Sequence, residues 1–143
     1  PITVMFGHAH DALEACDAVL VTSGTAALEA LLFKKPMVIA YRISPWTYRL
    51  VRRMVYQPYF GLPNILAGRF VVPEFIQDEA TPENLAQAME NWLADRVSRR
   101  RLEHLFARIH GDLRRNAAEK AASAVLACLN GAGQWNRLRR QPA

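Results

Sequence analysis

The sequence predicts an α/β fold in which helices pack on a parallel sheet and further helices follow. Three short apolar runs are separated by segments of helical spacing, which predicts parallel strands joined by right-handed crossovers. The run at residues 18–21 is apolar throughout, as in strands that are buried on both faces. Because 143 residues are fewer than the roughly 250 typical of an eight-stranded barrel, an open, doubly wound sheet is favoured.

Composition and charge exclude several classes of protein. Hydrophobic residues make up 51% of the chain and charged residues 22%, which excludes a disordered chain. Two distant cysteines exclude a disulfide scaffold, and every apolar run is shorter than the roughly 18 residues of a membrane-spanning helix. The net charge is −3 over residues 1–95 and +8 over residues 96–143. For the basic residues 96–143, a solvated helix face is a more favoured interpretation than a binding surface for any one anionic partner.

The first part of the chain alternates strands and helices. We expect a strand at residues 2–6, a short helix at 11–16 and a buried strand at 18–21. A helix with Thr25 as its N-cap follows, and residues 37–41 form the next apolar strand.

After Tyr41 the pattern changes to loops and helices. A Ser-Pro pair predicts a helix over residues 45–55, and the prolines and glycines of residues 56–75 predict a long loop. Thr81 followed by Pro82 predicts the start of another helix. The later apolar residues have the spacing of core-facing helical stripes, and they are Leu102, Leu105, Phe106, Ile109 and Leu113, then Ala121, Val125 and Leu129.

These elements predict three regions. Residues 1–95 form an incomplete sheet domain, and residues 96–130 form helices that pack on that domain or on a partner subunit. Residues 131–143 form a basic, flexible tail. Because Pro1 leads almost directly into a strand-like run, we expect the chain to be a piece of a longer protein.

The strongest chemical signal is the segment V-T-S-G-T-A-A-L-E at residues 21–29, where a predicted strand meets a predicted helix. Gly24 lets a ligand approach the backbone, and the first N–H groups of a helix are unpaired, so this turn predicts a phosphate site. Glu29 shares a helix face with Thr25, and a carboxylate there can accept hydrogen bonds from a ribose diol. The alternative is a capped helix with Glu29 in solvent.

A second candidate is Asn64, in the predicted loop Y-F-G-L-P-N-I-L-A-G-R. Its amide can donate and accept hydrogen bonds at once, which suits a nucleobase or a sugar hydroxyl. The alternative, favoured by the residues alone, is a turn asparagine that bonds its own backbone.

A third candidate is an aromatic and basic segment in the predicted helix 45–55. Aromatic rings interleaved with arginines suit a lipid–water interface. They suit equally well a partly buried helix whose arginines keep their charged ends in water. The candidate membrane-facing residues are Trp46, Tyr48, Arg49, Arg52 and Arg53.

The sequence predicts no metal site and no cofactor. The four histidines lack the spacing of zinc ligands, and no cysteine lies near them. Walker A, glycine-rich dinucleotide and nucleophile-elbow motifs do not occur in these 143 residues.

Four segments, in the same order along the chain, resemble lipid-A-disaccharide synthase. They are D-A-V-L-V-T-S-G-T-A-A-L-E, K-P-M-V-I-A-Y-R, L-P-N-I-L-A-G-R and P-E-F-I-Q. The first is shared loosely with other nucleotide-sugar enzymes, whereas the L-P-N segment is more specific. The resemblance covers about residues 11–130.

The resemblance implies the C-terminal half of a GT-B-type domain, a partial Rossmann-like parallel sheet followed by C-terminal helices. The family is an inverting glycosyltransferase of Gram-negative bacteria. It joins UDP-2,3-diacylglucosamine to 2,3-diacylglucosamine 1-phosphate, giving lipid A disaccharide 1-phosphate and UDP. It acts without a metal, as a peripheral protein on the cytoplasmic face of the inner membrane. The positions that carry over as UDP-binding are Ser23, Gly24, Thr25, Ala26, Glu29 and Asn64.

The resemblance also sets limits on this chain. The family's catalytic carboxylate lies in an N-terminal domain that these 143 residues do not contain, so we expect no catalytic residue here and no transfer by the chain alone. The family further implies a homodimer with exchanged C-terminal helices, with a crossover near the run Arg96–Arg101.

Two alternatives remain open. The first is another UDP-sugar enzyme, either an epimerase or a different GT-B transferase, which would share the S-G-T segment but not the L-P-N segment. The second is a basic module that binds a membrane or nucleic acid, although no nucleic-acid motif supports the latter.

Overall fold

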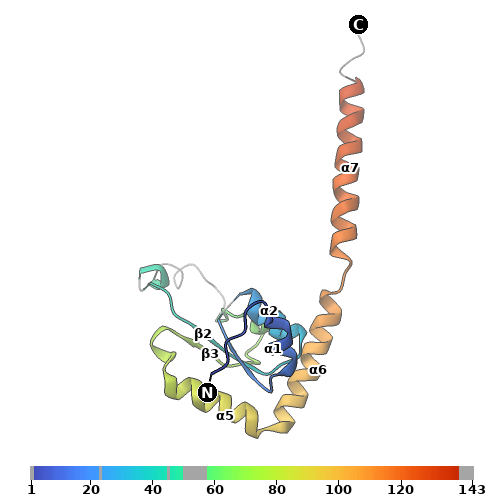
Figure 1. The fold of residues 1–143 in the computed structure, drawn as a ribbon. Coiled ribbons are helices and arrows are strands. Elements are labelled where there is room, and N and C mark those ends of the chain that lie inside the picture. The colour runs from blue at the N-terminus through green and yellow to red at the C-terminus, as the bar shows by residue number, and fades with distance from the viewer. Residues whose placement is uncertain (1, 23, 45, 50–57, 139–143) are drawn as a thin grey trace. The chain divides into compact units, whose positions relative to one another are not determined.

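The computed structural model describes residues 2–22, 24–44, 46–49 and 58–138 (Figure 1). The chain divides into two compact units, one of residues Pro1–Gly111 and one of residues Asp112–Ala143. Helices and strands alternate in the first unit, and helix dominates the second. In chain order the elements are α1 (Ala9–Ala15), β1 (Val19–Val21), α2 (Thr25–Leu32), β2 (Met37–Tyr41), α4 (Leu62–Ala67), β3 (Glu74–Ile76), a 3-10 turn η1 (Gln77–Glu79), α5 (Pro82–Ala94), α6 (Arg96–Leu113) and α7 (Ala117–Leu138).

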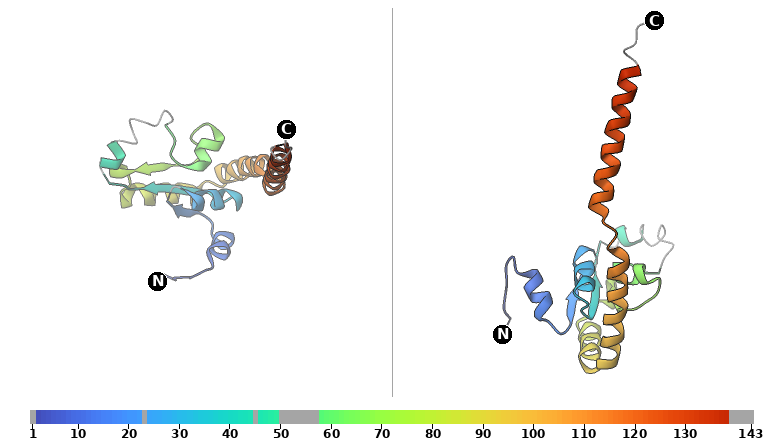
Figure 2. Two further views of the ribbon diagram at one scale, coloured as in Figure 1. Left: turned by 90° about the horizontal axis from the view of Figure 1, so that it is seen from above. Right: turned by 90° about the vertical axis from the view of Figure 1, so that its right-hand side faces the viewer.

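The sheet of the first unit has three strands in the order β1-β2-β3, and both pairs are parallel. Val21 pairs with Ile39, and Ile39 pairs on its other side with Glu74. The view from above in Figure 2 shows α4 and α5 on the two sides of this sheet. The predicted α/β class and the parallel pairing of the strands at residues 19–21 and 37–41 are therefore confirmed.

The core of the first unit joins the sheet to α2 and α6. Trp92 of α5 adds a hydrogen bond, because its indole Nε1 donates to the carbonyl oxygen of Met37 at 2.9 Å. Phe106 is fully buried and shares the core with Leu102 and Ile109, which confirms the apolar stripe predicted for α6 except at Leu113, which is 43% exposed. The buried cluster consists of Leu13, Ala27, Ala30, Leu31, Met37, Ile39, Val72, Leu102, Phe106 and Ile109.

The strand predicted at residues 2–6 is wrong. These residues are not part of the sheet, and Ile2 and Phe6 are 95% and 87% exposed. A strand is stabilised by a neighbouring strand that accepts and donates its backbone hydrogen bonds, and the described sheet offers residues 2–6 no such neighbour.

The predicted N-cap of α2 is also wrong, by one residue. Gly24 is the N-cap, and Thr25 is the first residue of the helix. Gly24 has φ +119° and ψ −148°, a conformation that residues with a Cβ rarely adopt. The turn therefore depends on glycine rather than on a hydroxyl cap.

The long loop predicted over residues 56–75 contains a helix, α4, and the first two residues of β3. The prolines and glycines that predicted a loop mark the ends of α4 instead. Gly61 is the N-cap, Pro63 lies in the first turn, and Gly68 ends the helix in the left-handed conformation.

The helix predicted over residues 45–55 falls partly outside the described residues. Residues 46–49 are helical, and the backbone N–H of Tyr48 donates to the carbonyl oxygen of Ser44 at 2.9 Å. By contrast, the cap predicted at the start of α5 is confirmed, since the Thr81 hydroxyl accepts from the backbone N–H of Asn84.

The core stripe predicted for residues 121–129 is wrong in the described structure. All side chains of residues 117–129 in α7 are exposed, including Val125 and Leu129. A helix buries an apolar stripe only against another element, and the described part of the second unit holds α7 and the end of α6 alone. The sequence placed a boundary after residue 95, whereas the structure keeps α6 with the sheet as far as Gly111.

We predict that Phe106→Ala lowers the free energy of unfolding by about 3–5 kcal/mol, because it leaves a cavity at a fully buried site. Urea denaturation of the two proteins measures the difference. The matched control is Glu103→Ala, an exposed site on the same helix, for which we expect a change within about 0.5 kcal/mol. Equal effects of the two substitutions would show that α6 does not belong to the core.

Candidate functional site

The candidate site lies at the carboxyl edge of the sheet. Because the three strands are parallel, β1, β2 and β3 all end at this edge, at Val21, Tyr41 and Ile76. Ligands of open α/β sheets bind in the crevice outside the carboxyl ends of the strands. The segments that follow the strands at this edge therefore form the candidate site.

The turn between β1 and α2 is the first of these segments. Gly24 is only partly exposed, but a Cβ added to it would meet no heavy atom within 4 Å. Thr25 and Ala26 are exposed and belong to the first turn of α2, whose N–H groups have no partner within a helix. The described part of this turn thus offers backbone donors and open space to an anion. Ser23, predicted to bind the nucleotide, lies outside the described residues.

Glu29 lies one helical turn after Thr25, and its side chain is half-buried. Helix α2 contacts α4, which carries Asn64. The structure therefore brings the helices of two predicted site residues, Glu29 and Asn64, next to each other. These residues were predicted from segments more than 30 positions apart in the sequence.

Asn64 is fully buried, and its amide is engaged within the protein. Its Nδ2 donates to the carbonyl oxygen of Val72 at 2.9 Å and to Oε1 of Glu74 at 2.7 Å. Its Oδ1 accepts from the backbone N–H groups of Val71 at 2.7 Å and of Val72 at 3.0 Å. In this arrangement the amide ties α4 to the segment before β3 and presents no free donor or acceptor to a ligand.

Glu74, the first residue of β3, completes this network. Its carboxylate accepts from the backbone N–H groups of Phe60 and Gly61, each at 2.9 Å, in addition to the amide of Asn64. Gly61 has no room for a side chain, because a Cβ would contact Cδ1 of Ile39 and would lie 2.8 Å from Oε1 of Glu74. The carboxylate therefore fixes the start of α4 against the sheet.

Gln77 holds the next segment at the same edge. Its Nε2 donates to the carbonyl oxygen of Ile43 at 2.9 Å, and its Oε1 accepts from the backbone N–H of Ile43 at 2.7 Å. Gln77 has φ +56°, which turns the chain as it leaves β3. Our reasoning from the sequence gave Glu74 and Gln77 no role, although both stand in the P-E-F-I-Q segment. For Glu74, the available signal was a charged residue directly before the apolar pair Phe75 and Ile76.

The membrane-facing candidates are only partly described. Trp46 is 79% exposed, and the guanidinium carbon of Arg49 lies 5.6 Å from the centre of its ring. Tyr48 is half-buried. Arg52 and Arg53 lie outside the described residues.

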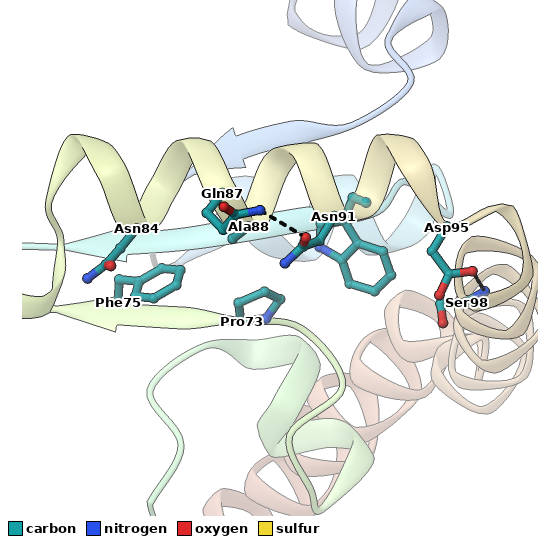
Figure 3. A pocket seen from close by; sticks show the side chains of 9 residues that line it. Pro73, Phe75, Asn84, Gln87, Ala88, Asn91, Asp95 and Ser98 are labelled. Carbon is teal, nitrogen blue, oxygen red and sulfur yellow. Dashed lines mark hydrogen bonds between the residues drawn. The ribbon is translucent and has the colours of Figure 1, made fainter.

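A separate cleft of about 430 Å³ runs between β3 and α5, away from the predicted site residues (Figure 3). Phe75 and Trp92 give it apolar walls, and the amides of Gln87 and Asn91 are joined by a hydrogen bond of 3.2 Å. At one end, hydrogen bonds from Ser98 lower the pKa of Asp95 below 3.8, with smaller contributions from the N–H of Val97 and the charge of Arg101. Asp95 thereby caps the start of α6.

The described residues contain neither a cluster suited to a metal ion nor a helix suited to crossing a membrane. Within the described ranges, no three His, Cys, Asp or Glu side chains are grouped in a way that could hold a metal ion. Among the helices so described, none has the length and hydropathy needed to cross a membrane.

The fold and the carboxyl edge of the sheet place the chain in a class of protein. The chain holds a partial Rossmann-like sheet with a glycine turn at the carboxyl end of its first strand and a helix beginning there. A family model described as lipid-A-disaccharide synthetase matches residues 2–127. The chain therefore belongs to the lipid-A-disaccharide synthetase family.

Relatives from three bacteria agree with this assignment. The lipid-A-disaccharide synthase of Dechloromonas aromatica is 58% identical over 130 residues, which are 91% of this chain and 34% of that protein. The corresponding protein of Azoarcus sp. is 55% identical over 91% of this chain and 33% of its own length. That of Aromatoleum aromaticum is 51% identical over 98% and 36%, respectively. The chain thus spans about a third of the length of the curated relatives it matches.

We predict that Asn64→Ala destabilises the chain more than Glu29→Ala does. The first change leaves the buried N–H groups of Val71 and Val72 without their acceptor, at a cost of roughly 1–3 kcal/mol for each group that stays unsatisfied. The second removes a half-buried carboxylate, for which we expect less than about 1 kcal/mol. Thermal unfolding followed by circular dichroism compares the two, and a stable Asn64→Ala protein would contradict the structural role of this amide.

Proposed function

We propose that this chain is the donor-binding part of a glycosyltransferase of lipid A synthesis. In this proposal, the whole protein joins UDP-2,3-diacylglucosamine to 2,3-diacylglucosamine 1-phosphate and releases lipid A disaccharide 1-phosphate and UDP. The observation that carries the proposal is the glycine turn at the end of β1, in a chain of the lipid-A-disaccharide synthetase family.

The UDP diphosphate would lie at the start of α2. The N–H groups of Thr25 and Ala26, the open space at Gly24 and the positive end of the helix dipole all favour a group of high negative charge. Ser23, from the same motif, is proposed to contribute its hydroxyl. These groups would also stabilise the charge that develops on UDP as the bond from the anomeric carbon to its phosphate oxygen breaks.

Glu29 is proposed to hold the ribose. Its carboxylate stands one turn into the helix that receives the diphosphate, and a carboxylate accepts hydrogen bonds from two neighbouring hydroxyls. Asn64 is proposed to support nucleotide binding indirectly. Its four hydrogen bonds hold α4 in place, and α4 contacts α2. Glu74 would support that placement from the sheet.

Transfer itself needs a group that takes the proton of the acceptor hydroxyl as its oxygen bonds to the anomeric carbon. We propose that this carboxylate belongs to an N-terminal domain outside these 143 residues, which agrees with relatives about three times as long. The chain alone would then hold the donor without transferring it.

We propose a peripheral membrane location on the cytoplasmic face, since both substrates carry acyl chains. The exposure of Trp46 and Arg49 supports this proposal, and Tyr48, Arg52 and Arg53 belong to the same segment of the sequence. A homodimer with exchanged C-terminal helices is a further proposal, supported by the exposed apolar side chains of Val125, Leu126 and Leu129.

We predict that the chain binds UDP weakly and that Glu29→Ala lowers the affinity at least about tenfold, because a charged hydrogen-bond acceptor is lost. Isothermal titration calorimetry measures both proteins, with UMP as the control ligand. The matched control is Glu90→Ala, which removes an exposed carboxylate from α5. Equal binding of UDP and UMP, or equal losses in the two variants, would argue against a diphosphate and ribose site at α2.

We also predict that the chain alone forms no lipid A disaccharide 1-phosphate from the two acylated substrates. Thin-layer chromatography of a reaction with radiolabelled acceptor measures product, and a complete relative such as the Dechloromonas aromatica protein is the positive control. Product formed by the 143 residues would place a catalytic group within them.

A further inference from the structure

A second hollow lies on the amino-terminal side of β3, away from the candidate donor site. It has a volume of about 310 Å³ and lies between α6 and residues 69–71, which come shortly before β3 begins at Glu74. The donor site proposed above lies instead where the strands end, at Val21, Tyr41 and Ile76. The hollow shares no lining residue with the proposed diphosphate and ribose site, although Val71 in its wall donates its backbone N–H to Asn64.

Three arginines line this hollow: Arg69, Arg101 and Arg108. All three are exposed, and among the residues that the structure describes none of their guanidinium groups is in an ion pair. Arg101 acts at longer range on Asp95, whose pKa it helps to lower. Three unpaired cations that converge on one depression favour a ligand with several anionic oxygens, and the guanidinium fork matches the geometry of phosphate.

The floor and rim of the hollow are apolar. Trp92, Leu102 and Leu105 line its interior and are buried or half-buried. Phe70 lines it as well and is 58% exposed. An edge contact with Tyr59, 4.8 Å between ring centres, holds the Phe70 ring in place.

Further apolar side chains are exposed just before Arg69. Ile65 and Leu66, on the helix that ends two residues before Arg69, are about 40% exposed. Arginines that keep their charged ends in water above an apolar floor, with an exposed ring beside them, are the arrangement of a protein surface at a lipid–water interface.

We propose that this hollow binds the phosphate headgroup of an anionic membrane lipid. Arg69, Arg101 and Arg108 would hold the phosphate oxygens, and Phe70 would enter the region between the headgroups and the acyl chains. Exposed aliphatic residues favour a lipid over a nucleic acid, because bases stack on rings and gain little from isoleucine or leucine. None of the residues that line the hollow belongs to residues 46–53, and the proposal does not depend on the donor site.

The test is co-sedimentation of the 143-residue chain with vesicles. One set of vesicles mixes phosphatidylglycerol with phosphatidylethanolamine, and the neutral set is phosphatidylcholine. We expect binding to the anionic set alone. Replacing the three hollow arginines together (Arg69→Gln, Arg101→Gln and Arg108→Gln) should lower that binding at least about tenfold.

The matched control removes the same charge from the same surface of the chain but outside the hollow. Arg96→Gln, Arg99→Gln and Arg100→Gln change three other arginines of α6, which line a different depression. We expect this control to lose less than about threefold, through screened long-range attraction alone. Equal losses in the two triple variants, or no loss in the hollow variant, overturn the proposal.

Two further arms separate lipid from other anions. Phe70→Ser keeps all charges and should still lower binding to anionic vesicles at least about threefold. NMR titrations with inorganic phosphate and with an RNA oligonucleotide test soluble ligands. If either one binds at the hollow arginines while anionic vesicles do not bind, the lipid proposal is overturned. Circular dichroism confirms that each variant folds, which is expected because the substituted side chains are exposed, apart from the half-buried Arg99.

Discussion

The carboxylate of Glu74 is the interaction on which the arrangement of the candidate site depends. It accepts from two consecutive backbone N–H groups, Phe60 and Gly61, and from the buried amide of Asn64. The carboxylate thereby gives all three donors an acceptor, so none of them is buried without a partner. Because Glu74 also pairs with Ile39 in the sheet, the start of α4 takes its position from the sheet rather than from its own residues. Helix α4 in turn lies against α2, where we propose that UDP binds.

Helix α6 shows how one element serves both the core and the surface. Its apolar stripe buries Leu102, Phe106 and Ile109 against the sheet, and five arginines lie on the same helix. Burial of the stripe fixes which arginines face outward together. Two of them, Arg101 and Arg108, meet Arg69 from a distant part of the chain at one hollow. The sequence shows only that this region is basic, whereas the structure shows which of its arginines line one hollow.

Polar groups at the two ends of the sheet have different partners. At the carboxyl edge, the side chain of Gln77 is engaged by the backbone of Ile43, so this part of the edge is pre-organised by hydrogen bonds. On the amino-terminal side, the arginines of the hollow have no ion pair among the described residues and lie over apolar side chains. Fixed hydrogen bonds suit the precise placement of a small ligand. Unpaired arginines over apolar side chains suit the surface of a membrane that contains anionic lipids.

The sequence by itself determined the α/β class, strand β2, the cap at Thr81 and the family, because these depend on local pattern and on contiguous motifs. Tertiary structure decided the rest. Residues 2–6 have strand composition but no partner strand, and the apolar face of α7 has no surface to bury against within its unit. The glycines and prolines around residues 61–68 predict a loop from the sequence. In the structure they mark the ends of α4, and the carboxylate of Glu74 holds its N-cap, Gly61. The sequence suggests Asn64 as a ligand-binding amide, and only the packed structure shows that four protein groups already use it, since hydrogen-bond partners seven to ten residues away are invisible to local pattern.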